Sequence, residues 1–302
     1  MLSRIASFIN RFPVKLVTSR SISIALAFTG FFFSSPILSA QNTYDPWLIY
    51  RSLALDDLKM ALAQIDQRLE SLTVEVARSE KLVRSGASPQ AELMELSGER
   101  QIRTAERDDL LGLIGWMEYL LRVSTLNTVP DETEYFEKLT GLLKPRVAHA
   151  SAITSLSEKR YAMLTKLRER RAISAEEFER AADELGEAKL RQLLYQSQYL
   201  SAQYALEVRH SKRVYDESAA LALAQSVRDS RIRLWERVLE TTSHRITRLS
   251  AMKERGIAPQ AELDAATASQ NTIKKALEDA KKAVVEPHPA PGQLKRPRNQ
   301  NI

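Results

Sequence analysis

"GASPQAEL", residues 86–93, and "GIAPQAEL", residues 256–263, are two nearly identical stretches of one 302-residue chain. They lie 170 residues apart, and the text at the midpoint, residues 171–178, is "RAISAEEF". Three copies at a fixed interval of 85 residues are typical of a repeat architecture. The sequence therefore predicts that one structural unit occurs three times.

The first and third copies have the features of a tight turn between two helices. Gly86 and Gly256 suit the left-handed residue that ends a helix. Pro89 and Pro259 suit the first position of the next helix, where the missing N–H costs nothing. The sequence thus predicts turns near residues 86–89 and 256–259.

The middle copy predicts the same turn at residues 171–174 with different residues. Ser174 suits an N-cap, and Glu177, three residues later, completes a capping box. Glu92 and Glu262 match Glu177 in register, in a first turn where the helix dipole favours negative charge. Arg171 replaces the glycine, so this turn is either slightly strained or built differently.

If the three turns point the same way, the chain must reverse between them. The first midpoint, residues 128–129, lies in "NTVPDE", where Pro130 and Asp131 favour a break and a restart. The second midpoint, residues 213–214, has neither Gly nor Pro nearby, so that return is inferred from the repeat alone. The alternative is one unbroken helix over residues 175–255, which would place the second and third turns at opposite ends.

Composition and apolar spacing predict an all-α chain. Gly and Pro are scarce, at 9 and 11 residues, and Ala, Leu, Glu, Arg, Lys and Gln dominate. Narrow apolar stripes such as Tyr161, Leu164 and Leu167 favour coiled-coil seams over a broad core. We expect elongated antiparallel coiled-coil helical hairpins over residues 41–285, in three repeats of 85 residues, with a kink or interruption at Pro145.

The two ends of the chain differ from the rest. In residues 1–40, four basic residues precede the apolar run "SISIALAFTGFFF" and a small residue, Ala40. This pattern predicts a cleaved signal peptide and export to the periplasm or cell envelope; the alternative is an uncleaved signal anchor. Residues 286–302 are Pro-rich, polar and basic, which predicts a disordered tail.

Charge and motifs give no support for catalysis or nucleic-acid binding. Without residues 1–40 and 284–302, the chain has equal numbers of acidic and basic residues, unlike a nucleic-acid binder. No histidine has a neighbour at metal-ligand spacing, and no Gly-rich phosphate loop or nucleophile elbow occurs; the histidines are His149, His210, His244 and His288. We expect no cofactor, no metal site and no enzymatic activity.

The repeated turn resembles the hairpin tip of HlyD-type periplasmic adaptors, also called membrane-fusion proteins, and the related tips of TolC-type outer-membrane channel proteins. The adaptor pattern is Arg, three residues, Leu, six residues, Ser, and no single copy here has all three. The matching positions, with the turn glycines, are Arg78, Leu82, Gly86 and Pro89; Met163, Leu167 and Ser174; and Arg248, Met252, Gly256 and Pro259.

The resemblance implies a partner-binding role for these residues. Leu or Met would make an apolar contact with the partner's tip, and Arg would donate a hydrogen bond to it. The leading hypothesis is a component of an efflux or secretion system that binds an outer-membrane channel or inner-membrane pump component. The alternative is a structural or scaffolding coiled coil of the envelope with no transport role, and either class permits homo-oligomers.

Overall fold

The computed structural model of the chain describes residues 53–126, 131–257 and 259–292. The predicted signal segment, residues 1–40, and the predicted break at residues 127–130 lie outside the described residues. None of the helices in the described part combines the length and the apolar character that crossing a membrane requires.

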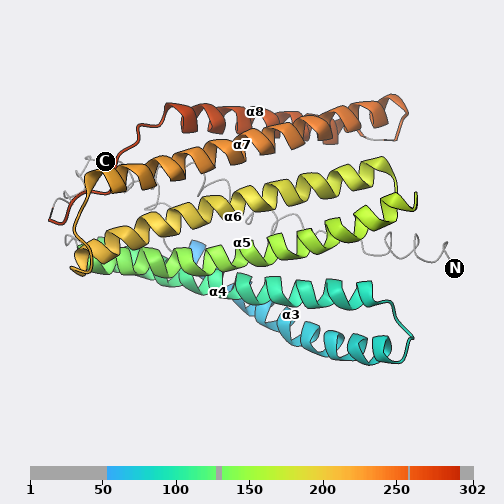
Figure 1. Cartoon of the computed structure of the whole chain (residues 1–302), viewed down its shortest axis with the longest axis horizontal. Helices are drawn as coiled ribbons and strands as arrows, with labels where there is room; N and C mark the ends of the chain where they lie inside the picture. Colours follow the sequence, from blue (N-terminus) through green and yellow to red (C-terminus); the bar gives the residue numbers. More distant parts are fainter. Residues whose placement is uncertain (1–52, 127–130, 258, 293–302) are drawn as a thin grey trace. The chain divides into compact units, whose positions relative to one another are not determined.

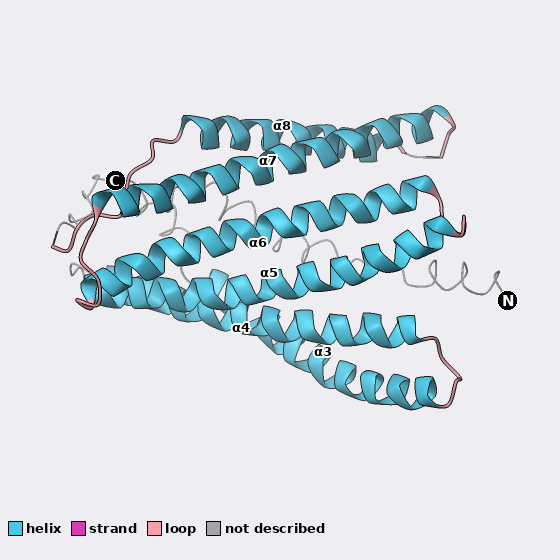
Figure 2. Cartoon of the chain, in the orientation of Figure 1, coloured by secondary structure: helices cyan, strands magenta, loops and turns pink. Residues whose placement is uncertain are grey.

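The described residues form six α-helices joined by turns and loops, with no strand among them (Figure 2). This confirms the predicted all-α fold class. The helices are α3 (Leu53–Arg84), α4 (Gln90–Leu126), α5 (Glu132–Glu169), α6 (Ala175–Arg209), α7 (Glu217–Glu254) and α8 (Gln260–Lys282).

Each helix packs against its neighbours in the sequence. The substantial contacts between described helices are α3 with α4, α4 with α5, α5 with α6, α6 with α7, and α7 with α8. The chain reverses direction at each connection, and the α3–α4, α5–α6 and α7–α8 turns lie at the end of the helices opposite the α6–α7 loop (Figure 1). The helices therefore follow one another in space as they do in the chain.

Side-chain caps explain where three of the helices begin. Asp131 accepts a hydrogen bond from the Glu134 amide at 2.8 Å and caps α5. Ser174 caps α6, and Asp216 caps α7 by accepting from the first-turn amides. These caps satisfy backbone N–H groups that have no partner inside the helix.

The second return occurs where the repeat places it. Helix α6 ends at Arg209, α7 begins at Glu217, and the two helices pack together. Ser211, between them, has a φ of +57°, in the left-handed region that helix-ending residues adopt. The alternative of one continuous helix over residues 175–255 is therefore wrong.

Pro145 does not interrupt α5, contrary to the prediction. The helix runs from Glu132 to Glu169 with Pro145 inside it. Because proline lacks an N–H, the carbonyl of Gly141 loses its helical partner. Gly112 of α4 lies against this point: a Cβ on Gly112 would be 3.1 Å from the Gly141 oxygen. The α4 backbone thus approaches α5 closely where the helical hydrogen bond is missing.

The prediction of disorder from residue 286 is wrong for residues 287–292. The His288 and Pro289 carbonyls accept hydrogen bonds from Tyr215 and Arg209, and the Gly292 amide donates to Glu132. Proline and charge favour disorder only when a segment has nothing to pack against. Here the ends of two helices and the α6–α7 loop supply that surface, while residues 293–302 lie outside the described part.

Candidate partner-binding tips

Three tips contain the sequence-predicted site: the first tip (residues 78–93), the second tip (163–178) and the third tip (248–263). In each, the residue of positive φ donates to the carbonyl three residues earlier, and the next residue donates to the carbonyl five earlier. The pairs are Gly86–Val83 and Ala87–Leu82, Arg171–Arg168 and Ala172–Leu167, and Gly256–Lys253 and Ile257–Met252, at 2.8–3.0 Å. This pair of bonds is the Schellman motif, which satisfies carbonyl groups at the end of a helix.

The second tip has the same turn although it lacks glycine. Arg171 has a φ of +55°, beside +73° for Gly86 and +71° for Gly256. A residue with a Cβ is strained in this region. The sequence left open whether this turn is strained or built differently, and the structure shows the first of the two.

Both prolines lie one residue earlier than predicted. Helices α4 and α8 begin at Gln90 and Gln260, directly after Pro89 and Pro259. Pro259 is the N-cap of α8, with an extended backbone at φ −73° and ψ 148° and no side-chain cap. Its carbonyl accepts from the Glu262 amide at 3.2 Å. The fixed φ of proline suits this extended position as well as the first helical one.

The apolar tip residues occupy one equivalent position. The carbonyls of Leu82, Leu167 and Met252 each accept the longer-range bond of the turn. Leu82 and Met252 are both 37% exposed, and Leu167 is half-buried. Ile257, next to the third turn, is 64% exposed. Each tip therefore presents an apolar side chain that its own helices only partly cover.

One helical turn before these residues lie Arg78, Met163 and Arg248. Arg78 is exposed, while Met163 and Arg248 are half-buried. Within the part of the chain that the structure describes, neither arginine has an acidic partner. Two of the tips thus combine a partly exposed apolar residue with an arginine whose charge no nearby acid neutralises.

The second tip differs from the others in its side-chain packing. Phe178 contacts Tyr161 across the hairpin, with ring centroids 5.1 Å apart. The Arg168 guanidinium lies 4.3 Å from the centroid of the Phe178 ring. In the first tip, by contrast, the Ser88 hydroxyl donates to Glu92. The second tip is therefore held together by aromatic contacts that position Arg168.

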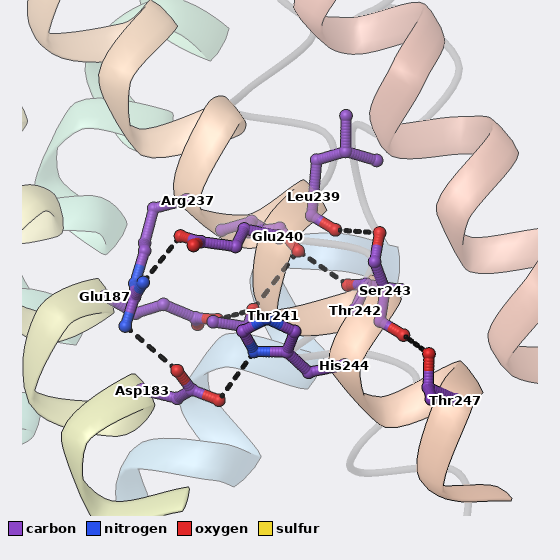
Figure 3. A network of polar contacts seen from close by, with 11 residues as sticks. Asp183, Glu187, Arg237, Leu239, Glu240, Thr241, Thr242, Ser243, His244 and Thr247 are labelled. Atoms are coloured by element: carbon purple, nitrogen blue, oxygen red, sulfur yellow. Dashed lines mark hydrogen bonds and ion pairs between the residues drawn. The ribbon is translucent and has the colours of Figure 1, made fainter. Parts of the chain in front are cut away.

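A polar network between α6 and α7 was not predicted from the sequence. Arg237 donates to Asp183 at 2.9 Å and to Glu240, and His244 forms an ion pair with Asp183 at 3.6 Å (Figure 3). Gly186 makes room for this arginine, because a Cβ there would lie 2.9 Å from its Nε atom. The network fixes the register of the two helices.

A second network of the same kind joins α4 to α5. Asp109 accepts from Arg146 at 3.1 Å, and His149 Nδ1 lies 3.3 Å from its other oxygen. Burial alone would raise the pKa of Asp109, but the His149 hydrogen bond and the Arg146 charge outweigh it and lower that pKa. The shared sequence signal is Asp-x-x-Gly at 109–112 and 183–186, which the 85-residue repeat does not relate.

Comparison of the chain with protein-family models, with curated proteins and with solved structures gave no match. The residues of the tips and the order of the helices are therefore the basis for a functional proposal.

Proposed function

We propose that the chain is a non-catalytic protein of the cell envelope that binds a partner through its three tips, as a component of an efflux or secretion system. The observation that carries this proposal is the equivalence of the three turns. Each has the same hydrogen-bond pair and presents Leu82, Leu167 or Met252 at the same position. A surface repeated in this way suits a partner that offers several similar contacts.

The chemistry of the tips favours a helical partner with acidic or carbonyl groups at its end. Leu82 and Met252 offer apolar area, and Arg78 and Arg248 offer guanidinium donors without a neighbouring acid. Guanidinium groups donate in a planar fork that matches carboxylates and exposed carbonyls. Apolar residues with adjacent Arg are typical of the residues that carry binding energy at interfaces.

The finer architecture is part of the same proposal. We take each hairpin to be an antiparallel coiled coil and the three hairpins to be copies of one 85-residue unit. Buried residues at seven-residue spacing in α3, namely Leu58, Ile65 and Leu72, support the coiled-coil seam. The shared turn geometry supports the repeat.

A scaffold with no transport role is the second candidate, and one observation favours it. In the Schellman motif, an apolar residue at the position of Leu82, Leu167 and Met252 often packs against the residue that follows the turn. The recurrence of apolar residues there can thus serve helix termination alone. A scaffold would self-associate without a channel or pump partner.

A photo-crosslinking amino acid placed at residues 82, 167 and 252 in living cells separates the two candidates. The transport proposal expects adducts with a channel or pump subunit, identified by mass spectrometry. The control is the same amino acid at Val74, which is 68% exposed on the body of α3. Adducts only with other copies of this chain would support the scaffold instead.

The combined substitutions Leu82→Asp, Leu167→Asp and Met252→Asp give an independent test. They should abolish recovery of the partner while leaving the helical circular dichroism intact. Val74→Asp, a charge at an exposed site away from the tips, should leave recovery unchanged. Equal recovery from the triple variant would contradict tip binding.

A further inference from the structure

The ends of α5 and α6 and the loop after α6 hold residues 287–292 in place (Figure 2). The Tyr215 hydroxyl donates to the His288 carbonyl, and Arg209 Nη2 donates to the Pro289 carbonyl, both at 3.1 Å. The Gly292 amide donates to Glu132 at 3.1 Å. Three hydrogen bonds along six residues, all to the backbone of the segment, form a built contact.

The surface beneath this segment is aromatic and cationic. The His288 ring packs edge-on against Phe136, with centroids 5.2 Å apart. Arg209, whose side chain is 3% exposed, lies over the same Phe136 ring at 4.2 Å and pairs with Glu132 at 3.0 Å. Phe136 continues a row of aromatic contacts through Tyr135 to Trp116. The receptor surface is therefore rigid and formed by the helices themselves.

The segment has the composition of an extended peptide ligand. Proline occupies positions 287, 289 and 291, which fixes φ at every second residue and keeps the residues before proline extended. Such peptides lose little conformational freedom on binding, and aromatic surfaces recognise them through their carbonyl groups. The hydrogen bonds to the carbonyls of His288 and Pro289 follow this mode.

We propose that the surface formed by Glu132, Phe136, Arg209 and Tyr215 is a binding site for an extended, proline-containing peptide. Residues 287–292 are its intramolecular occupant, and protonation of His288 releases them. The site lies away from the three tips, at the end of the helices where α6 turns into α7 (Figure 1). It therefore gives the chain a second binding surface that the tail keeps closed.

The charges around His288 determine the direction of the switch. Arg209 on α6 faces the ring with a positive charge, Glu132 on α5 is already paired with Arg209, and Tyr215 approaches from the loop. His210, also on α6, is paired with Glu137 of α5 at 3.2 Å. No acid is thus left to stabilise an imidazolium ring within this cluster of described residues.

Burial lowers the pKa of His288 to about 4, and the charge of Arg209 acts in the same direction. The released residue has a pKa of about 6.5. Because the docked pKa is the lower one, docking is strongest above pH 6.5 and weakens as the pH falls toward 4. These two pKa values correspond to docking that is about 30-fold weaker at pH 5 than at pH 7.5.

Spin labels on the full chain test the release. The sequence has no cysteine, so Lys138→Cys on α5 and Glu286→Cys before the segment carry the only labels. We expect a narrow distance distribution at pH 7.5 that broadens as the pH falls to 4.5. His288→Phe keeps an uncharged ring and should stay narrow throughout, and His288→Lys should be broad throughout. His210→Gln, the control for the neighbouring histidine, should follow the unsubstituted chain.

A labelled peptide, VVEPHPAPG, tests the site itself. It should bind the full-length His288→Lys chain at pH 7.5, because the site is then open, and should not bind the unsubstituted chain, whose site is occupied. Tyr215→Phe added to His288→Lys should weaken binding by about 5- to 10-fold, as expected for one lost hydrogen bond. Circular dichroism checks that each variant is folded. A distance distribution independent of pH, or a peptide that binds both chains equally, would overturn the proposal.

Discussion

The hydroxyl group of Tyr204 forms two hydrogen bonds with the backbone of Asp216. It donates to the Asp216 carbonyl at 3.0 Å and accepts from the Asp216 amide at 2.8 Å. Tyr204 is a buried residue of α6, and Asp216 is the N-cap of α7. One side chain thus closes the α6–α7 loop, which has neither glycine nor proline.

Tyr204→Phe should destabilise the chain by about 2 kcal/mol, because both backbone groups of Asp216 lose their partner in a partly buried place. Urea unfolding measures the change, and hydrogen exchange should rise in residues 211–217. The control is Tyr199→Phe, which removes a hydroxyl that has no bonding partner among the described residues. Equal effects from the two variants would contradict this role of Tyr204.

Arg171→Gly should stabilise the second tip by about 0.5 kcal/mol, since glycine relieves the strain at a φ of +55° but gains freedom in the unfolded chain. Gly86→Ala should destabilise the first tip by about 1 kcal/mol for the same reason. Nothing lies within 4 Å of a Cβ at Gly86, so backbone strain alone sets this cost. Arg170→Gly, at a φ of −86°, is the control and should not stabilise. Thermal unfolding compares the three.

Gly112→Ala and Gly115→Ala, three residues apart on α4, should have opposite effects. At Gly112 the added Cβ meets the Gly141 oxygen at 3.1 Å, so α4 and α5 must move apart and stability falls. At Gly115 nothing lies within 4 Å, and alanine should stabilise by up to about 1 kcal/mol through helix propensity. Denaturant unfolding of both variants is the measurement. A stabilising Gly112→Ala would show that the close approach is not needed.

Asp109→Asn should make the chain less stable at neutral pH by about 2 kcal/mol, because the bonds from Arg146 and His149 lose a charged acceptor. The pKa of Asp109 is lowered in the folded chain, so its stabilisation is complete above the unfolded value near 4 and disappears as the pH falls through the folded pKa. The variant should therefore lose less stability than the unsubstituted chain on acidification.

Asp108→Asn is the matched control for this prediction. Asp108 is exposed and pairs with Arg107 at 3.7 Å on the surface, where ion pairs contribute little. Unfolding curves measured between pH 7 and pH 2 should therefore follow the unsubstituted chain. The interpretation of the α4–α5 network is wrong if the two asparagine variants show the same pH dependence.

The sequence was informative where one residue determines the local backbone. Gly86, Gly256 and Ser174 marked helix ends correctly, because a left-handed residue or a cap acts within a few residues of itself. The 85-residue interval also located the second return, which no local signal marked. Fold class and turn positions could thus be read before any contact was known.

The rest depends on contacts between distant residues. Tyr204 and Asp216 are 12 positions apart, and Arg209 and Pro289 are 80 positions apart. The Asp183 network joins positions 54 apart on two helices. No periodic pattern predicts which polar side chains of two helices will meet, and the prolines of the tail resemble a disordered linker until their receptor surface is known.

The packing of each helix on its neighbours in the chain has a consequence for how the molecule opens. Detaching α8 breaks the contacts with α7 but leaves those among α3, α4, α5 and α6 unchanged. Unfolding can therefore begin at either end of the series and advance one interface at a time, as in linear arrays of structural units. Amide protection should then be greatest in α5 and α6 and decline toward α3 and α8, so that a break in the chain weakens the structure locally.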